Sequence, residues 1–196
     1  TLETIMFQSG YLTIKKAMRV GPRDVFRLGF PNQEVKLSFT DALLNDYTPD
    51  TLNTAGFQND MYRALEARDM DVVKATLERL FSSIPFEWYN AGTLDKYEGY
   101  YASVVYSFFT SIGFDITPEK SSSHGRADLV IKTNDRVYVF EFKVVEIVGD
   151  GKKAIDQIRE RGYHHQYVKA GKEVVLVGID FSKKERNVVG FAFEMV

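Results

Sequence analysis

The chain has 196 residues, of which 44% are hydrophobic and 27% charged, and its net charge is −2. This composition is typical of a globular protein with a sizeable core, and the charge gives no whole-molecule signal for a nucleic-acid partner. The absence of cysteine excludes disulfides, a thiol nucleophile and thiolate zinc sites, and no apolar run approaches the roughly 18 residues of a transmembrane helix. We therefore expect a cytoplasmic protein with no membrane partner. Because the chain begins at Thr1 rather than Met, we also expect a fragment of a longer protein.

Residues 1–92 are expected to form an N-terminal linker and mainly helical subdomain, preceded by a β-hairpin. Two β-prone stretches, "YLTIKKAM" and "VFRLGFPN", flank "RVGPRD", in which Gly21-Pro22 marks a turn. Residues 33–84 carry apolar side chains at helical spacing, and Pro85 ends that run.

Residues 93–196 show a different pattern and are expected to form a second domain. A strongly apolar helix ends at Gly113, a plausible C-cap, and a later helix at about 152–167 is interrupted near Gly162. The remaining β-prone stretches are predicted strands at about 114–119, 126–133, 137–146, 173–181 and 187–196. The order predicts an α/β fold with a mixed central sheet flanked by helices.

Two acidic residues lie in the predicted hairpin of residues 126–146. If Asn134-Asp135 is a two-residue turn, Asp128 faces Glu141, and Lys143 lies on the same face with Arg126 opposite it. Like charges directly opposite each other destabilise a sheet. A divalent cation would remove this repulsion, and oxygen ligands without imidazole or thiolate favour Mg²⁺ or Mn²⁺. The alternative is an exposed sheet face on which Lys143 and Arg126 neutralise the two acids.

The ordered set of Asp128, then Glu141-Phe142-Lys143, behind a helix that carries Glu98, resembles the PD-(D/E)XK nuclease superfamily. The proline of the signature is replaced, since the chain reads "GRADLVI" there. The segments "AIDQIRERGYHHQY" and "VVLVGIDFSKKERNVVGF" resemble the branch of the superfamily that is fused to AAA-ATPase-like domains. "FQSGYLTIKK" and "LGFPNQEVKLSF" are similar to the segment that follows the ATPase module in that branch. The resemblance implies a restriction-endonuclease-like fold.

The resemblance also implies roles for individual residues. Asp128 and Glu141 would bind the metal with help from a backbone carbonyl near Phe142, Lys143 would be the catalytic lysine, and Glu98 would orient water or contact a second metal. Two further groups are expected to contact nucleic acid or brace the site, namely Arg126 and His124 before the acids, and Gln157 and Tyr163 after them. Gln157 and Tyr163 could equally be a helix-surface and a packing residue. His124, His164 and His165 lack the spacing of a zinc site and are expected at the surface or against phosphate.

These patterns predict a metal-dependent nuclease domain that uses Mg²⁺ or Mn²⁺ to hydrolyse phosphodiester bonds, with DNA as the expected substrate. Residues 120–172 hold 11 Lys and Arg against 7 Asp and Glu, a local surplus that suits phosphate contacts. An ATPase module in the full-length protein would be a second partner. One alternative is a noncatalytic nucleic-acid- or protein-interaction module that retains the fold. Another is that residues 1–90 are the functional element, as a docking region for an ATPase.

Overall fold

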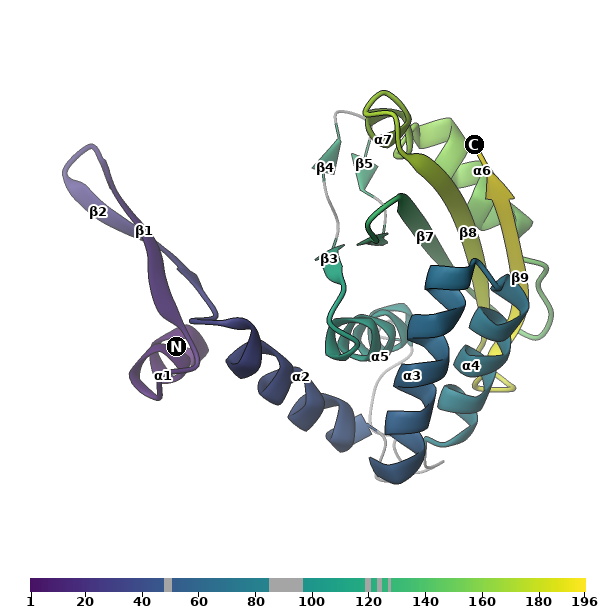
Figure 1. Ribbon diagram of the computed structural model, residues 1–196, viewed down its shortest axis with the longest axis horizontal. Helices are drawn as coiled ribbons and strands as arrows, with labels where there is room; N and C mark the ends of the chain where they lie inside the picture. Colours follow the sequence, from purple (N-terminus) through teal and green to yellow (C-terminus); the bar gives the residue numbers. More distant parts are fainter. Residues whose placement is uncertain (48–50, 85–96, 119–120, 123–124, 127) are drawn as a thin grey trace.

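The computed structural model describes residues 1–47, 51–84, 97–118, 121–122, 125–126 and 128–196 (Figure 1). In chain order, the helices and strands are α1 (Leu2–Gln8), β1 (Thr13–Val20), β2 (Arg23–Gly29), α2 (Gln33–Tyr47), α3 (Thr51–Ala67), α4 (Met70–Ser82), α5 (Tyr97–Ser111), β3 (Asp115–Pro118), β4 (Ser121–Ser122), β5 (Gly125–Arg126), β6 (Leu129–Lys132), β7 (Arg136–Val145), α6 (Lys152–Arg161), α7 (His165–Val168), β8 (Glu173–Ser182) and β9 (Val188–Met195). None of the helices in these described ranges has both the length and the apolar character needed to cross a bilayer.

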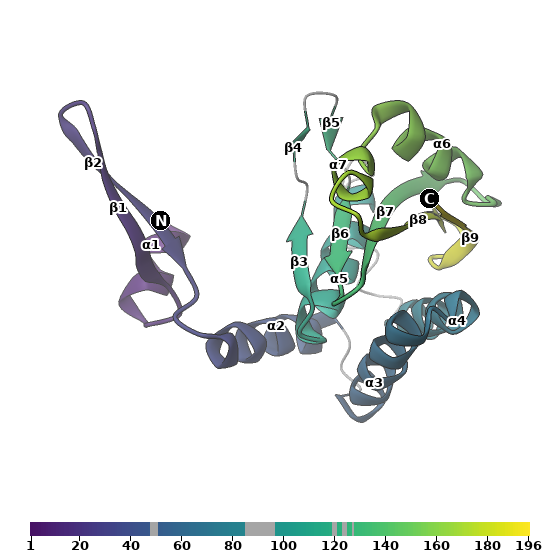
Figure 2. The ribbon, with the colours of Figure 1, turned by 45° about the horizontal axis from the view of Figure 1, so that its top comes forward.

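Among the described residues, five strands form the central sheet in the order β3-β6-β7-β8-β9. β7 and β8 are parallel, whereas the other neighbouring strands are antiparallel. A parallel pair needs a crossover connection, and α6 provides it on one side of the sheet (Figures 1 and 2). The expected α/β class, with a mixed sheet flanked by helices, is therefore confirmed.

Both faces of the central strands are covered, which explains their nearly continuous apolar sequences. On one face, Tyr138 and Phe140 of β7 belong to a large core that includes residues of α3, α4 and α5. On the other face, Val137 and Val139 pack in a second core with Ile158 of α6. Successive side chains of a strand point to opposite faces, so the odd-numbered residues of β7 lie on the α6 side.

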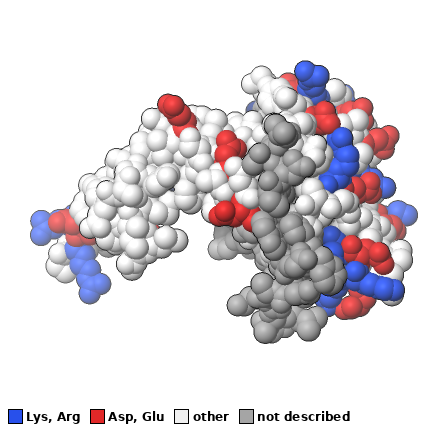
Figure 3. Space-filling view, turned by 90° about the horizontal axis from the view of Figure 1, so that it is seen from below, with Lys and Arg blue, Asp and Glu red and all other residues white. Residues whose placement is uncertain are grey.

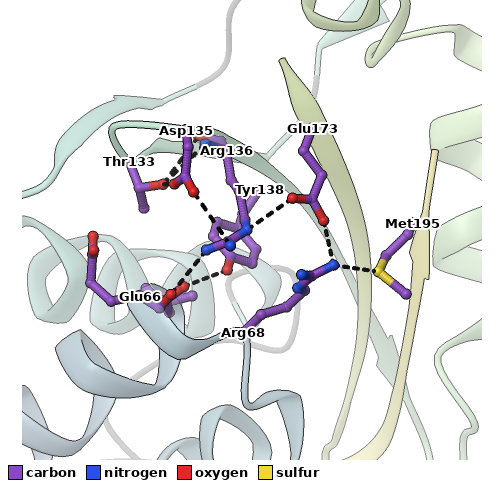
Figure 4. A network of polar contacts seen from close by, with 9 residues as sticks. Glu66, Arg68, Thr133, Asp135, Arg136, Tyr138, Glu173 and Met195 are labelled. Atoms are coloured by element: carbon purple, nitrogen blue, oxygen red, sulfur yellow. Dashed lines mark hydrogen bonds and ion pairs between the residues drawn. The ribbon is translucent and has the colours of Figure 1, made fainter.

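Helices α3 and α4 are attached to the sheet by polar contacts as well as by the core (Figure 4). The hydroxyl of Tyr138 donates to the carbonyl oxygen of Leu65 at 2.5 Å, and Arg136 donates to the carbonyl of Glu66 at 2.9 Å. Glu173 at the start of β8 accepts from Arg136 at 3.1 Å and also pairs with Arg68, in the turn between the two helices. The proposed domain boundary at residue 92 would separate these partners, and it stays a prediction.

The N-terminal strands lie apart from the central sheet. β1 and β2 form a two-stranded antiparallel sheet of their own around Gly21-Pro22, as the sequence predicted. Figures 1 and 2 both show this hairpin projecting from the body of the molecule, to which α2 connects it. The short helix α1 was not predicted.

The hairpin of β6 and β7 has the predicted register but is shorter than predicted. Ile131 pairs with Tyr138 and Leu129 with Phe140, as a two-residue Asn134-Asp135 turn requires. The ladder begins at Leu129, and Asp128 lies in a bend before it, so the expected direct pairing of Asp128 with Glu141 is wrong. The predicted strand 126–133 is likewise interrupted.

The expected placement of Arg126 opposite Lys143 is also wrong. Arg126 belongs to β5, where it pairs with Ser121 of β4. The chain therefore leaves the central sheet before residue 129, and the short β4–β5 ladder extends beyond the sheet (Figures 1 and 2).

Candidate active site

Strand β7 has two charged side chains on the face of the sheet that packs against α6. Glu141 and Lys143 follow Val137 and Val139 on the α6 side of the sheet, so they continue the line of residues that forms the second core. Glu141 is only 2% exposed, whereas Lys143 is partly exposed. The alternative of an exposed sheet face carrying both acids is therefore wrong, because α6 covers Glu141.

Asp128 reaches the same region although it lies outside the ladder. Its Oδ2 accepts a hydrogen bond from the backbone N–H of Phe142 at 2.8 Å. The carboxylate thus lies against the backbone of β7 directly after Glu141. The bend at Asp128 replaces a cross-strand pair with a hydrogen bond from the backbone N–H of Phe142 to the Asp128 carboxylate, and it still brings the two acids together.

The carboxylate of Glu141 has one satisfied oxygen and one unsatisfied oxygen. Its Oε1 accepts a hydrogen bond from Nε2 of Gln157 in α6 and lies 3.5 Å from the ammonium of Lys143. Its Oε2 is buried and accepts no hydrogen bond from any residue in the described part of the chain. A buried polar atom without a partner is costly and often marks a place where a ligand, ion or water binds.

The electrostatics of Glu141 reflect this position. Burial, followed by the negative charge of Asp128, raises the pKa of Glu141 from 4.5 to about 7, while Lys143 acts in the opposite direction. Burial is the largest cause of this shift, and Glu141 therefore titrates near neutral pH.

These residues fit a divalent cation. The donor set consists of two carboxylates, with a free buried oxygen on one of them, and it contains no nitrogen or sulfur ligand. Mg²⁺ commonly takes only one or two carboxylates and completes its shell with water and substrate phosphate. Within the described residues, no group of three or more His, Asp or Glu side chains that could hold a metal ion is found. Any cation held here would therefore have two carboxylates as its side-chain ligands among the described residues.

A glycine allows α6 to lie close enough for Gln157 to reach Glu141. Gly178 of β8 is the register partner of Glu141. A Cβ atom at residue 178 would lie 2.1 Å from the carbonyl oxygen of Gly151, which is the N-cap of α6. No side chain fits there, so glycine at residue 178 sets the distance between the helix and the sheet.

Asp180 is a candidate residue that the sequence analysis missed. It is 4% exposed and is the register partner of Lys143 on β8. Its Oδ2 accepts from the N–H of Gly151 at 2.8 Å, and its Oδ1 is buried without a hydrogen-bond partner among the described residues. It borders a pocket of about 530 Å³ next to Lys143 and Lys153. The only sequence signal was a single acid inside the apolar run "EVVLVGIDF".

The other predicted site residues are distributed differently. Glu98 lies in the first turn of α5, and its side chain is outside the described part of the structure, as is the whole of His124. Tyr163 is buried in the second core, which agrees with the packing alternative. His165 is exposed as expected, but His164 is buried, so its expected surface position is wrong.

One comparison with known proteins points to a superfamily, and a second finds a relative of similar sequence. Residues 96–191 match the PD-(D/E)XK nuclease superfamily, and this segment contains Asp128, Glu141, Lys143 and Gln157. The chain is also 42% identical, over 192 residues, to a protein of Azotobacter chroococcum mcd 1 described as an uncharacterized protein in the vnfD 5′ region. That alignment covers 98% of this chain but only 37% of the relative. The candidate site thus lies entirely within the segment that is similar to the PD-(D/E)XK nucleases.

Proposed function

We propose that residues 93–196 are a metal-dependent nuclease domain of the PD-(D/E)XK superfamily, with a restriction-endonuclease-like arrangement, that hydrolyses phosphodiester bonds of DNA. The observation that carries the proposal is the buried Glu141 carboxylate, which lies beside Asp128 and Lys143 and has one oxygen free. The match of residues 96–191 to this superfamily supports it.

Each residue has a definite part in this proposal. Asp128 and Glu141 would hold a Mg²⁺ or Mn²⁺ ion, and the backbone carbonyl near Phe142 would be a further ligand. When bound, the cation supplies positive charge for the phosphate and acidity for a water molecule. Gln157 fixes the orientation of the Glu141 carboxylate through its hydrogen bond to Oε1. The ammonium of Lys143 stabilises negative charge that develops on the phosphate during hydrolysis.

The remaining residues are proposed to contact the substrate or water. Arg126 and His124 precede the site and would contact the phosphate backbone, and Glu98 would orient water. We place the domain in the cytoplasm and propose an ATPase module of the full-length protein as its partner. The resemblance of residues 1–92 to the segment that follows such a module supports this partner.

The test is cleavage by the 196-residue chain. Supercoiled plasmid, single-stranded DNA and RNA are each incubated with the protein in Mg²⁺, in Mn²⁺ and in EDTA. We expect DNA cleavage that requires the cation and is abolished by Glu141→Gln. Glu146→Gln is the matched control, because Glu146 lies just beyond the end of β7, is exposed and pairs with Lys183 rather than with a residue of the candidate site.

If none of these substrates is cut with either cation, the nuclease proposal fails. Binding of nucleic acid without cleavage would then favour a noncatalytic module. Cleavage that survives Glu141→Gln would place the activity elsewhere in the protein.

A further inference from the structure

The first 29 residues, which comprise α1, β1 and β2 and are here called the N-terminal hairpin unit, have almost no core. All seven residues of α1 are described, and none of them is buried. In the hairpin, Val20 is 59% exposed and Phe26 is 52% exposed. An isolated two-stranded hairpin is at best marginally stable in water, so the unit needs a surface to pack against. Exposed apolar patches of this kind mark interaction sites.

The exposed apolar side chains lie on both faces of the hairpin. Met18 pairs with Val25 on one face, which also carries Val20. Phe26 pairs with Ala17 on the opposite face. A bilayer surface or a nucleic-acid duplex would meet one of these faces and leave the other in water. A groove in a protein can cover both, so the apolar pattern favours a protein partner.

The charges of the hairpin indicate which charge the contact surface of that partner should carry. Lys16 lies directly opposite Arg27 in the register, a like-charge pair that destabilises a free hairpin. Arg23 lies on the same face, and the described hairpin places no acidic residue there. Figure 3 shows Lys and Arg side chains, with acidic side chains beside them, at the end of the molecule that carries the hairpin. An acidic rim on the partner would neutralise these three cations, whereas a second copy of the hairpin would add to their repulsion.

We propose that the N-terminal hairpin unit docks in an apolar groove with an acidic rim on a further domain of the same polypeptide. The relative from Azotobacter chroococcum extends well beyond the aligned region, because the alignment covers only 37% of its length. If the polypeptide of the present chain has similar additional sequence, that sequence would form the groove within the same molecule. This inference concerns packing and does not depend on nuclease activity.

The test compares hydrogen exchange in the 196-residue chain and in the whole polypeptide that the natural gene encodes. We expect the backbone amides of β1 and β2 to exchange at least tenfold more slowly in the longer polypeptide. In that polypeptide, Phe26→Ser and the charge reversal Lys16→Glu should each speed exchange in the hairpin severalfold. Val148→Ser is the control, since Val148 is highly exposed but lies far along the chain in the β7–α6 connection. It should leave exchange in the hairpin unchanged.

Equal exchange rates in the two polypeptides would overturn the proposal. It would also be overturned if the 196-residue chain showed hairpin protection on adding a DNA duplex or vesicles of phosphatidylglycerol, or if protection rose with its own concentration. These outcomes would assign the surface to nucleic acid, to a membrane or to a second copy. None of the readouts involves cleavage, so failure here is distinct from failure of the nuclease proposal.

Discussion

The metal-free protein should lose stability as the pH rises, because Glu141 loses its proton. Replacing Glu141 with Gln should remove most of this loss. Burial and the charge of Asp128 raise the pKa of Glu141 from 4.5 to about 7. The folded state thus binds this proton more tightly than the unfolded state does. Its contribution to stability is fully present below pH 4.5 and is lost as the pH rises through 7. At about 1.4 kcal/mol for each pKa unit, the loss amounts to about 3 kcal/mol.

The assay is urea denaturation in EDTA at several pH values from 4.5 to 8, with wild type and Glu141→Gln measured side by side. We expect the two proteins to have similar stability at pH 4.5 and the variant to be more stable at pH 8 by up to about 3 kcal/mol. Burial lowers the pKa of His164, which makes stability fall toward acid pH. That effect is common to both proteins and cancels in their difference. If the difference in stability does not change between pH 4.5 and 8, the account of Glu141 is refuted.

Three further changes test other parts of the structure. Lys143→Met should lower cleavage by about 100-fold or more while cation binding survives. Lys153→Met, which removes a lysine bordering the same pocket, is measured beside it, and a cleavage rate of Lys143→Met equal to that of the wild type would contradict the role of Lys143. Asp128→Asn should abolish Mn²⁺ binding in calorimetry, and an unchanged titration would move the cation site elsewhere. Tyr138→Phe should cost about 1–3 kcal/mol of unfolding free energy, because the carbonyl of Leu65 loses a buried donor. An unchanged urea midpoint would show that water replaces that bond.

Local rules predicted the parts of the fold that depend on short stretches of chain. The Asn134-Asp135 turn fixed the register of β6 and β7, because a two-residue loop leaves one pairing. The bend at Asp128 was not predictable in the same way. It depends on a hydrogen bond from the backbone of Phe142 to a side chain, which competes with continued pairing of the strands.

The alternation of side chains along β7 could not predict that the candidate site is buried. Alternation placed Glu141 and Lys143 on the same face, but it could not show that a crossover helix covers that face. The close approach of α6 depends on Gly178, which gave no signal of its own within an apolar run. The importance of Asp180 follows from its parallel pairing with Lys143, a contact between distant segments that no local pattern reveals.

The order in which the chain assembles follows from how the candidate ligands are distributed. Asp128 directly precedes β6 and Glu141 lies on β7, so both flank one antiparallel hairpin with a short turn, and such hairpins form within about 1–10 μs. Gln157 and the parallel strand β8 join them only through the α6 crossover, a non-local step that is intrinsically slower. We therefore expect the two carboxylates to meet before the helix that covers them is in place. We expect refolding in EDTA to be faster at pH 5 than at pH 8 in stopped-flow experiments, and the difference to shrink when Mn²⁺ is added.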